Sequence, residues 1–290
     1  MCVQGLTRIV LVKDFSYWGR DGCLLRVASV RSADDQSTSN DKPAIVLLHG
    51  GGPDHESLVP LAQRLADLHR VFLPDIRGYG RSICRDPHAH TWARYVEDIV
   101  ALLDQLGLDK AILAGTGLGS TICLRTAVAH PDRVRALVLI SVEDIEDDEA
   151  KKAESAFMDA FAERVRSGGI EAGWEPILPT LAPIIGTMVR DAIPRSDPES
   201  IAAAAAIGHD RSFRSIKELR EITAPILIFP GVDARHPAVL AKNLAAMLPN
   251  AHLATERFTD GIRTIDEFAQ TLVPSIRDFL NKVSGQGPLD

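Results

Sequence analysis

The chain has 290 residues, of which 46% are hydrophobic and 24% charged, and its formal net charge is −7. This is enough for one large globular domain with an insertion, or for two modest domains. The acidic balance gives no basic footprint for nucleic acid and disfavours anionic membranes, and no apolar run approaches the roughly 20 residues of a membrane helix. We therefore expect neither a nucleic-acid nor a membrane partner.

Cysteine usage and the N-terminus both predict a cytoplasmic protein. The four cysteines, at positions 2, 23, 84 and 123, show neither CxxC spacing nor a cluster with histidine. Free thiols and no metal site are the expectation. Residues 1–5 lack the basic and apolar regions of a signal peptide.

Strands and helices alternate through the first half of the chain. A predicted hairpin at 6–13 and 22–30 precedes a polar loop at 32–42. Predicted strands follow at 44–48, 71–74, 110–113 and 134–140, with helices between them at 57–68, 91–106 and from 121 to about 130. This order predicts a mostly parallel α/β sheet.

The alternation stops between 144 and 220, where only helical stretches are predicted. Strands resume at 225–231 and 252–258, with helices at 238–248 and 266–283. A helical block between two strands is most simply a cap over the carboxyl ends of the strands, where ligands bind in open α/β sheets. We therefore divide the chain into a core at 1–143 and 221–290 and a cap at 144–220.

The segment 114–120, Ala-Gly-Thr-Gly-Leu-Gly-Ser, joins a strand to a helix. Its pattern is that of a nucleophile elbow, in which a nucleophile stands between two small residues. Only one register fits, with Gly115 and Gly119 on the two sides and Gly117 at the centre. Gly117 has no side chain that could attack a substrate. Glycine also removes the backbone strain, roughly 1–3 kcal/mol, that this position imposes on other residues.

Four segments in this order resemble the α/β-hydrolase superfamily, and the similarity covers nearly the whole chain. They are His49-Gly-Gly-Gly-Pro53, Asp75-Ile-Arg-Gly-Tyr-Gly-Arg-Ser82, the elbow, and His130-Pro-Asp-Arg-Val134. The resemblance is to the epoxide-hydrolase and dehalogenase-like or the proline-iminopeptidase-like branch, with a degenerate catalytic triad. It implies an eight-stranded, mostly parallel sheet with a helical cap inserted after the sixth strand. It also implies an oxyanion hole at Gly50, Gly51 and Leu118.

The resemblance places a catalytic acid after the strand at 225–231. Asp233 is the candidate there and Asp144 the alternative, and a helix cap or loop ion pair explains Asp233 equally well. The catalytic histidine should follow the last strand, but that position reads Asp260-Gly261. We therefore predict that the base is missing along with the nucleophile, so that Gly117→Ser alone does not restore esterase activity.

Three other histidines could be recruited to the site. His55, in the oxyanion loop, is the catalytic candidate among them. His209 and His236 are expected to be solvated or structural.

The cap predicts the kind of ligand. Ile184, Ile185 and Met188 form an apolar stripe that we expect to line a cavity above Gly117, although plain packing of the cap on the core is the competing interpretation. The main hypothesis is a non-serine enzyme without a cofactor: a lyase, cyclase, isomerase or atypical hydrolase acting on a small, largely apolar carbonyl compound.

Two alternatives stay open. One is a non-catalytic protein that binds a small molecule, and the other is an epoxide or ester hydrolase with a displaced nucleophile. Either a monomer or a homodimer is expected.

Overall fold

The computed structural model describes residues 10–32, 42–256, 258 and 261–285. Within these residues eight strands form one sheet in the order β1-β2-β4-β3-β5-β6-β7-β8. Their bounds are Val10–Trp18 (β1), Leu24–Ser32 (β2), Ala44–Leu48 (β3), Arg70–Pro74 (β4), Ala111–Thr116 (β5), Val134–Ile140 (β6), Ile226–Phe229 (β7) and Ala251–Leu253 (β8). β1 and β2 run antiparallel, as do β2 and β4, and all other neighbours are parallel. The expected eight-stranded, mostly parallel sheet is confirmed.

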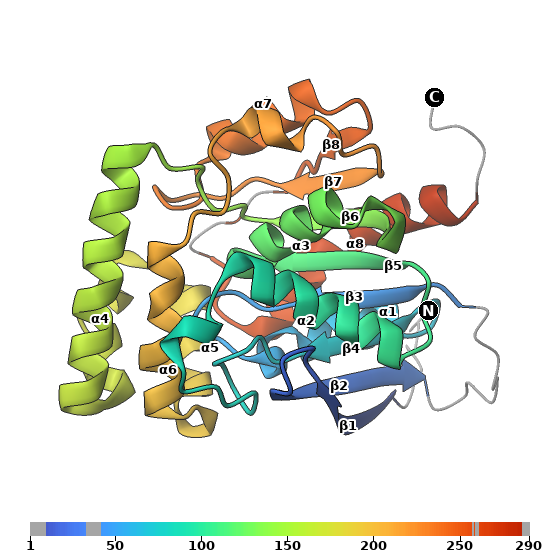
Figure 1. Cartoon of the computed structure of the whole chain (residues 1–290). Helices are drawn as coiled ribbons and strands as arrows, with labels where there is room; N and C mark the ends of the chain where they lie inside the picture. Colours follow the sequence, from blue (N-terminus) through green and yellow to red (C-terminus); the bar gives the residue numbers. More distant parts are fainter. Residues whose placement is uncertain (1–9, 33–41, 257, 259–260, 286–290) are drawn as a thin grey trace.

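Helices cover both faces of this sheet (Figure 1). One face carries α1 and α8, and the other carries α2, α3 and α7. Their bounds are Val59–Leu65 (α1), Trp92–Gln105 (α2), Leu118–Ala129 (α3), Ala238–Met247 (α7) and Ile265–Ser284 (α8). None of the described helices is long and apolar enough to cross a membrane.

Local sequence explains where these helices begin and end. The Thr91 hydroxyl accepts a hydrogen bond from the Arg94 amide at the start of α2, and α2 stops before Gly107, whose φ is +64°. α8 begins with a capping box in which Thr264 and Glu267 satisfy each other's amides.

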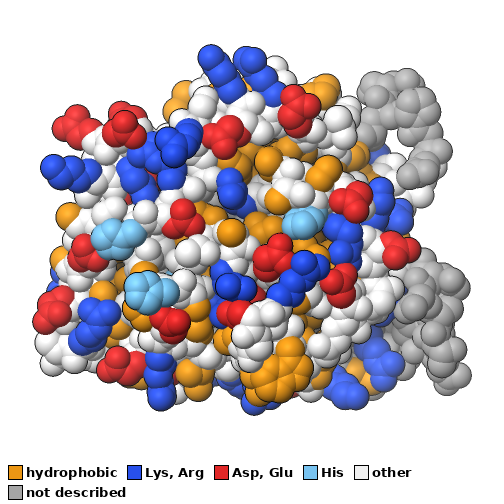
Figure 2. All heavy atoms as spheres, viewed as in Figure 1, with side chains coloured by type: hydrophobic (Ala, Val, Ile, Leu, Met, Phe, Trp, Pro, Cys, Tyr) orange, Lys and Arg blue, Asp and Glu red, His pale blue; other side chains and the backbone are white. Residues whose placement is uncertain are grey.

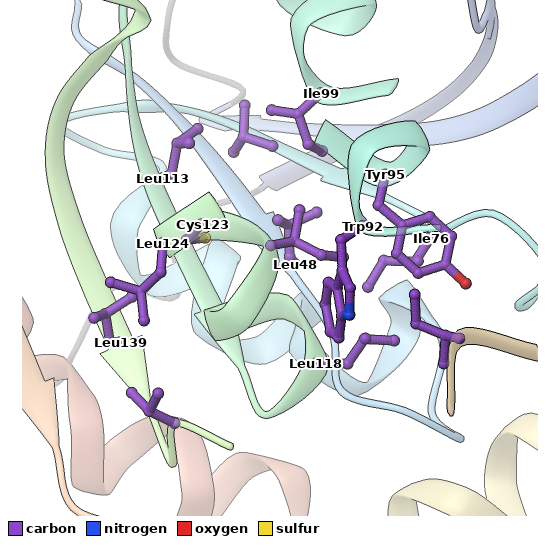
Figure 3. Close-up of a cluster of buried hydrophobic side chains, with 14 of the residues drawn as sticks. Leu48, Ile76, Trp92, Tyr95, Ile99, Leu113, Leu118, Cys123, Leu124 and Leu139 are labelled. Carbon is purple, nitrogen blue, oxygen red and sulfur yellow. The ribbon is translucent and has the colours of Figure 1, made fainter. Parts of the chain in front are cut away.

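The core lies between the sheet and its helices. Side chains that point alternately to the two faces of the central strands form it. In β5, Ile112 and Ala114 face the cluster under α1 and α8, whereas Leu113 faces the cluster under α2 and α3. Figure 3 shows part of the second cluster, with Leu48 and Leu118 among its buried side chains. On the face shown in Figure 2, acidic and basic side chains are intermixed. Exposed pairs of this kind each contribute little, so the fold is stabilised mainly by the two apolar clusters.

A helical block follows β6, as predicted. It contains α4 (Asp148–Trp174), α5 (Pro183–Ala192) and α6 (Pro198–Ala204), joined by short 3₁₀ turns. α4 is interrupted at Gly169, whose φ is +86°. In Figure 1, α4 and α6 stand beyond the carboxyl ends of the parallel strands, where the cap was expected.

Two strand bounds differ clearly from the sequence-based expectations, and the first is that β1 extends to Trp18 instead of ending at 13. β8 ends at Leu253 instead of extending to 258. It is the edge strand, and Leu253 is partly exposed, so little burial favours a longer pairing. The predicted polar loop at 32–42 lies almost entirely outside the described residues, as do residues 1–5.

Candidate functional site

The turn between β5 and α3 has the expected elbow geometry. Gly117 has φ +48° and ψ −116°, a conformation that residues with side chains rarely adopt. A Cβ on Gly115 would lie 2.3 Å from the carbonyl carbon of Gly119, and a Cβ on Gly119 would lie 2.6 Å from the carbonyl oxygen of Leu48. Backbone contact therefore requires both flanking glycines, and the predicted positive φ of Gly117 is confirmed.

The loop after β3 lies beside this turn. The Gly50 Cα is 4.0 Å from the position that a Cβ on Gly117 would take. Leu118 is the first residue of α3. The first hydrogen bond of this helix runs from the Thr121 amide to the Gly117 carbonyl at 3.1 Å. The Leu118 amide therefore has no acceptor within α3 and is free to bind an oxyanion. Gly51, the other predicted oxyanion residue, is exposed to solvent.

His49 fixes this loop and does not act as a base. Its Nε2 accepts the Ile76 amide at 2.9 Å, so Nδ1 carries the proton and donates to the Gly50 carbonyl at 2.8 Å. Burial lowers the pKa of His49, which keeps the ring neutral. Both nitrogens are occupied by structural hydrogen bonds.

A histidine does face the elbow, and it is His236. Its Nε2 lies 3.2 Å from the position of a Cβ on Gly117. Its Nδ1 lies 2.8 Å from Asp233 Oδ1, and the same oxygen accepts the backbone amides of Arg235 and His236 at 2.9 Å each. The hydrogen bond from His236 lowers the pKa of Asp233, although partial burial opposes this. Asp233 is therefore a carboxylate that holds the proton on Nδ1 and leaves Nε2 as an acceptor toward the elbow.

From sequence, His236 was expected to be solvated or structural, because a histidine in such a loop more often has that role than a catalytic one. Gly231 is the residue that permits the loop after β7 to turn back toward the sheet: a Cβ on it would lie 2.1 Å from the carbonyl oxygen of His236. The available signal was a glycine after a buried strand followed by Asp-x-x-His. Asp260, at the expected position of the base, lies outside the described residues.

Two polar side chains that the sequence analysis did not single out also lie here. The Tyr79 hydroxyl is 3.8 Å from the position of a Cβ on Gly51, and no hydrogen bond joins it to the described residues. Burial raises the pKa of Tyr79, and the charge of Glu143 raises it further, so the hydroxyl stays protonated. Glu143 accepts a hydrogen bond from the Thr121 hydroxyl at 3.0 Å.

The cap closes over the oxyanion loop. A Cβ on Gly52 would lie 2.6 Å from the Trp174 ring and 3.0 Å from Val189. Ile184 and Met188 are buried in the same apolar cluster as α1 and α8, and Ile185 packs against that cluster. These three residues pack the cap onto the core, so their expected role in binding stays a prediction.

His55 lies apart from the elbow, whereas Asp144 lies beside the loop that carries His236. His55 Nδ1 is 2.7 Å from Asp75 Oδ1, and both residues line a cavity of about 500 Å³ that neither Gly117 nor His236 lines. The Asp144 amide donates to the Arg235 carbonyl at 2.8 Å, but the side chain of Asp144 accepts the amide of Ile145 and forms no hydrogen bond with His236. In the part of the chain that the structure describes, no group of three or more His, Cys, Asp or Glu side chains could hold a metal ion.

Comparison with known proteins places this site in context. Residues 43–178 match the sequence family described as alpha/beta hydrolase fold. A 2-hydroxymuconate semialdehyde hydrolase of Pseudomonas putida is 36% identical over 100 residues, which is 34% of this chain and 35% of the relative. The first such relatives are matched over only 35% to 39% of their own length.

Solved structures match over almost the whole chain. A thermophilic esterase from Thermogutta terrifontis has a TM-score of 0.75 at 24% identity, covering 93% of this chain and 99% of that one. The bottromycin epimerase BotH, solved in complex with bottromycin A2, has a TM-score of 0.65 at 23% identity, covering 92% and 97%. At these identities the likeness shows the arrangement of sheet and cap and not an activity.

Proposed function

We propose that this chain, which has the α/β-hydrolase fold with a helical insertion after β6, hydrolyses a small ester or lactone by activating water directly. The observation that carries the proposal is the 3.2 Å between His236 Nε2 and the position of a Cβ on Gly117. In a triad hydrolase a side chain at that position gives its proton to the histidine. Here Gly117 supplies no such proton, and a water molecule beside Gly117, hydrogen-bonded to His236 Nε2, takes that part.

The reaction needs one proton acceptor and one oxyanion site. A water oxygen attacks the substrate carbonyl carbon while His236 Nε2 takes a proton from that water. The carbonyl oxygen becomes an oxyanion beside the free amides of Leu118 and the loop at Gly50 and Gly51. The tetrahedral intermediate then collapses, the bond to the leaving oxygen breaks, and His236 returns its proton to that oxygen. Asp233 stays ionised throughout and holds the imidazole in place.

The rate enhancements that such groups usually contribute are sufficient for a slow enzyme. A positioned general base contributes about 10²–10⁴-fold, and an oxyanion donor a further 10²–10³-fold. The Tyr79 hydroxyl, which has no partner among the described residues and lies beside Gly51, could add a hydrogen bond to the same oxygen. The name of the semialdehyde hydrolase relative supports hydrolysis as the reaction class.

The test is turnover of p-nitrophenyl acetate and a panel of five- and six-membered lactones. His236→Ala is expected to lower kcat by about 10²–10⁴-fold because it removes the base. His209→Ala is the matched control, since His209 also pairs with an aspartate, Asp159 Oδ1 at 2.7 Å, but lies on the exposed cap. This control should retain wild-type kcat.

Direct activation of water also predicts the absence of a covalent intermediate. The time course should show no burst, the protein should resist fluorophosphonates, and mass spectrometry should find no acylated protein. A single turnover in H₂¹⁸O should leave ¹⁸O in the released acid and none on the protein. An acyl-enzyme, or unchanged activity in His236→Ala, would contradict the proposal.

A second candidate is proton transfer at a carbon next to a carbonyl, as in an isomerase or epimerase. Two observations favour it: His236 is a base beside a position that has no nucleophile, and the epimerase BotH is among the structural neighbours. The same base would take a carbon-bound proton while the amides hold the enolate oxygen. The two reactions separate in D₂O, where exchange of the substrate α-proton without acid release supports proton transfer. If neither occurs with any ligand that binds, the chain is a binding protein.

A further inference from the structure

The cavity that His55 and Asp75 line, with a volume of about 500 Å³, lies between β2, the loop after β4 and the cap segment at 194–198. This is within the range of small-molecule sites. Its lining is charged: it includes Arg26, Arg81, Arg195 and the pair His55–Asp75. None of the elbow residues lines it, so it is separate from the site of the proposed hydrolysis.

The carboxylates that line this cavity already have cationic partners. Asp14 accepts Arg81 Nη1 at 2.7 Å, and Asp75 accepts the His55 ring at 2.7 Å. Asp197 accepts two hydrogen bonds from Arg85, at 3.0 and 2.7 Å. A cationic ligand would therefore find no free carboxylate here.

Hydrogen-bond donors, by contrast, are left over. Arg26 has no carboxylate partner among the described residues, and its guanidinium bonds only the Ser16 hydroxyl. The hydrogen bond to Asp75 occupies His55 Nδ1, and no hydrogen bond joins Nε2 to a residue in the described part of the chain. Burial opposes a charge on His55, but Asp75 outweighs this and raises the pKa of His55, which favours a second N–H on the ring.

We propose that this cavity binds a small anion, through a carboxylate or phosphate group that accepts hydrogen bonds from Arg26 and His55. Guanidinium and imidazolium groups both form charge-assisted hydrogen bonds with such groups. Arg195, which lines the cavity from the cap, is held to the core by Asp54 at 2.6 and 2.9 Å. An anion in the cavity therefore lies beside the ion pair that already joins the cap to the core.

The experiment is calorimetric titration of the whole chain with inorganic phosphate and, separately, with acetate, at fixed pH and ionic strength. Arg26→Met is expected to weaken binding at least fivefold. Arg26 is exposed, so this variant should fold normally. Arg20→Met is the matched control, because Arg20 is also exposed but pairs with Glu97 and Asp104 outside the cavity.

A second measurement follows the ring of His55 directly. In ¹H–¹⁵N spectra of the histidine rings, phosphate or acetate should shift the His55 Nε2 signal, assigned with His55→Gln, and leave that of His209 in place. Stronger binding of phosphate than of acetate identifies a phosphoryl ligand, and the reverse order a carboxylate. Binding should persist in His236→Ala, so its outcome is independent of the proposed hydrolysis.

Two results would overturn the proposal. One is the absence of saturable binding of either anion across the millimolar range. The other is an equal loss in Arg26→Met and Arg20→Met, because that result reflects only the change in net charge.

Discussion

Gly117 leaves His236 facing a position without a hydroxyl group, and one substitution tests that alignment. Because His236 Nε2 lies 3.2 Å from the position of a Cβ on Gly117, Gly117→Ser is expected to create a reactive serine. This reverses the expectation from sequence, which assumed that no base was present. The serine variant should react with fluorophosphonates and show a burst with p-nitrophenyl acetate.

The same variant should be less stable. A side chain at φ +48° costs about 1–3 kcal/mol, which urea unfolding can measure. Gly117→Ala is the control, with similar strain and no hydroxyl. If the serine variant is no more reactive than the alanine variant, His236 is not aligned with the elbow in solution.

Tyr79→Phe tests the hydroxyl beside the oxyanion loop. If that hydroxyl bonds the developing oxyanion, kcat should fall about tenfold while KM changes little. The free energy of unfolding should stay within about 0.5 kcal/mol, because no described residue bonds the hydroxyl and none loses a partner. A purely structural role for Tyr79 predicts the opposite result, lower stability with kcat unchanged.

At the scale of elements, the close approach of α3 to β3 depends on the absence of a side chain at Gly119. Gly119→Ala would place a Cβ 2.6 Å from the Leu48 carbonyl oxygen and 2.7 Å from that of His49, and rigid backbone cannot yield as a side chain can. We expect a loss of about 3 kcal/mol in the free energy of unfolding.

Gly107→Ala measures the cost of backbone strain without the steric overlap that Gly119→Ala creates. Gly107 has φ +64° but no atom within 4 Å of an added Cβ. Its loss should be about 1 kcal/mol, since only the conformation is strained. Equal losses at Gly119 and Gly107 in chemical denaturation would show that α3 can shift away from β3 without penalty.

At the scale of the whole molecule, the features that could be predicted from sequence are those with local signals. Apolar runs and helical periodicity indicated the sheet and the insertion, and glycine spacing indicated the elbow. The position of His236 depends on how the loop after β7 returns to β5. The Asp-x-x-His spacing after Gly231 indicates that the two side chains pair, but it does not specify that return. The stripe containing Ile184 and Met188 was equally compatible with lining a cavity and with packing against α8. Only the space left between cap and core decides whether these side chains line a cavity or pack against α8.

The last prediction concerns how stability depends on pH through the buried pair His55–Asp75. The pKa of His55 is raised from 6.5: burial opposes this, but the hydrogen bond and charge of Asp75 outweigh it, aided by Asp54 and Glu56. Its contribution is therefore complete below pH 6.5 and is lost as the pH rises through the folded pKa. The pKa of Asp75 is lowered from 3.8 by the hydrogen bond from His55, although burial opposes this. Its contribution is complete above pH 3.8 and is lost as the pH falls through the folded pKa.

Both contributions are complete together only between pH 3.8 and 6.5. Urea unfolding of the wild type and of His55→Gln, measured across this range and about two pH units beyond each end, should therefore give the largest difference in free energy inside the window. The difference should shrink toward alkaline pH as folded His55 loses its proton, and toward acid as Asp75 gains one. A difference that stays constant with pH would mean that His55 stabilises the fold by packing alone. The exposed pair His209–Asp159 provides the comparison, and His209→Gln should leave the pH profile of the wild type nearly unchanged.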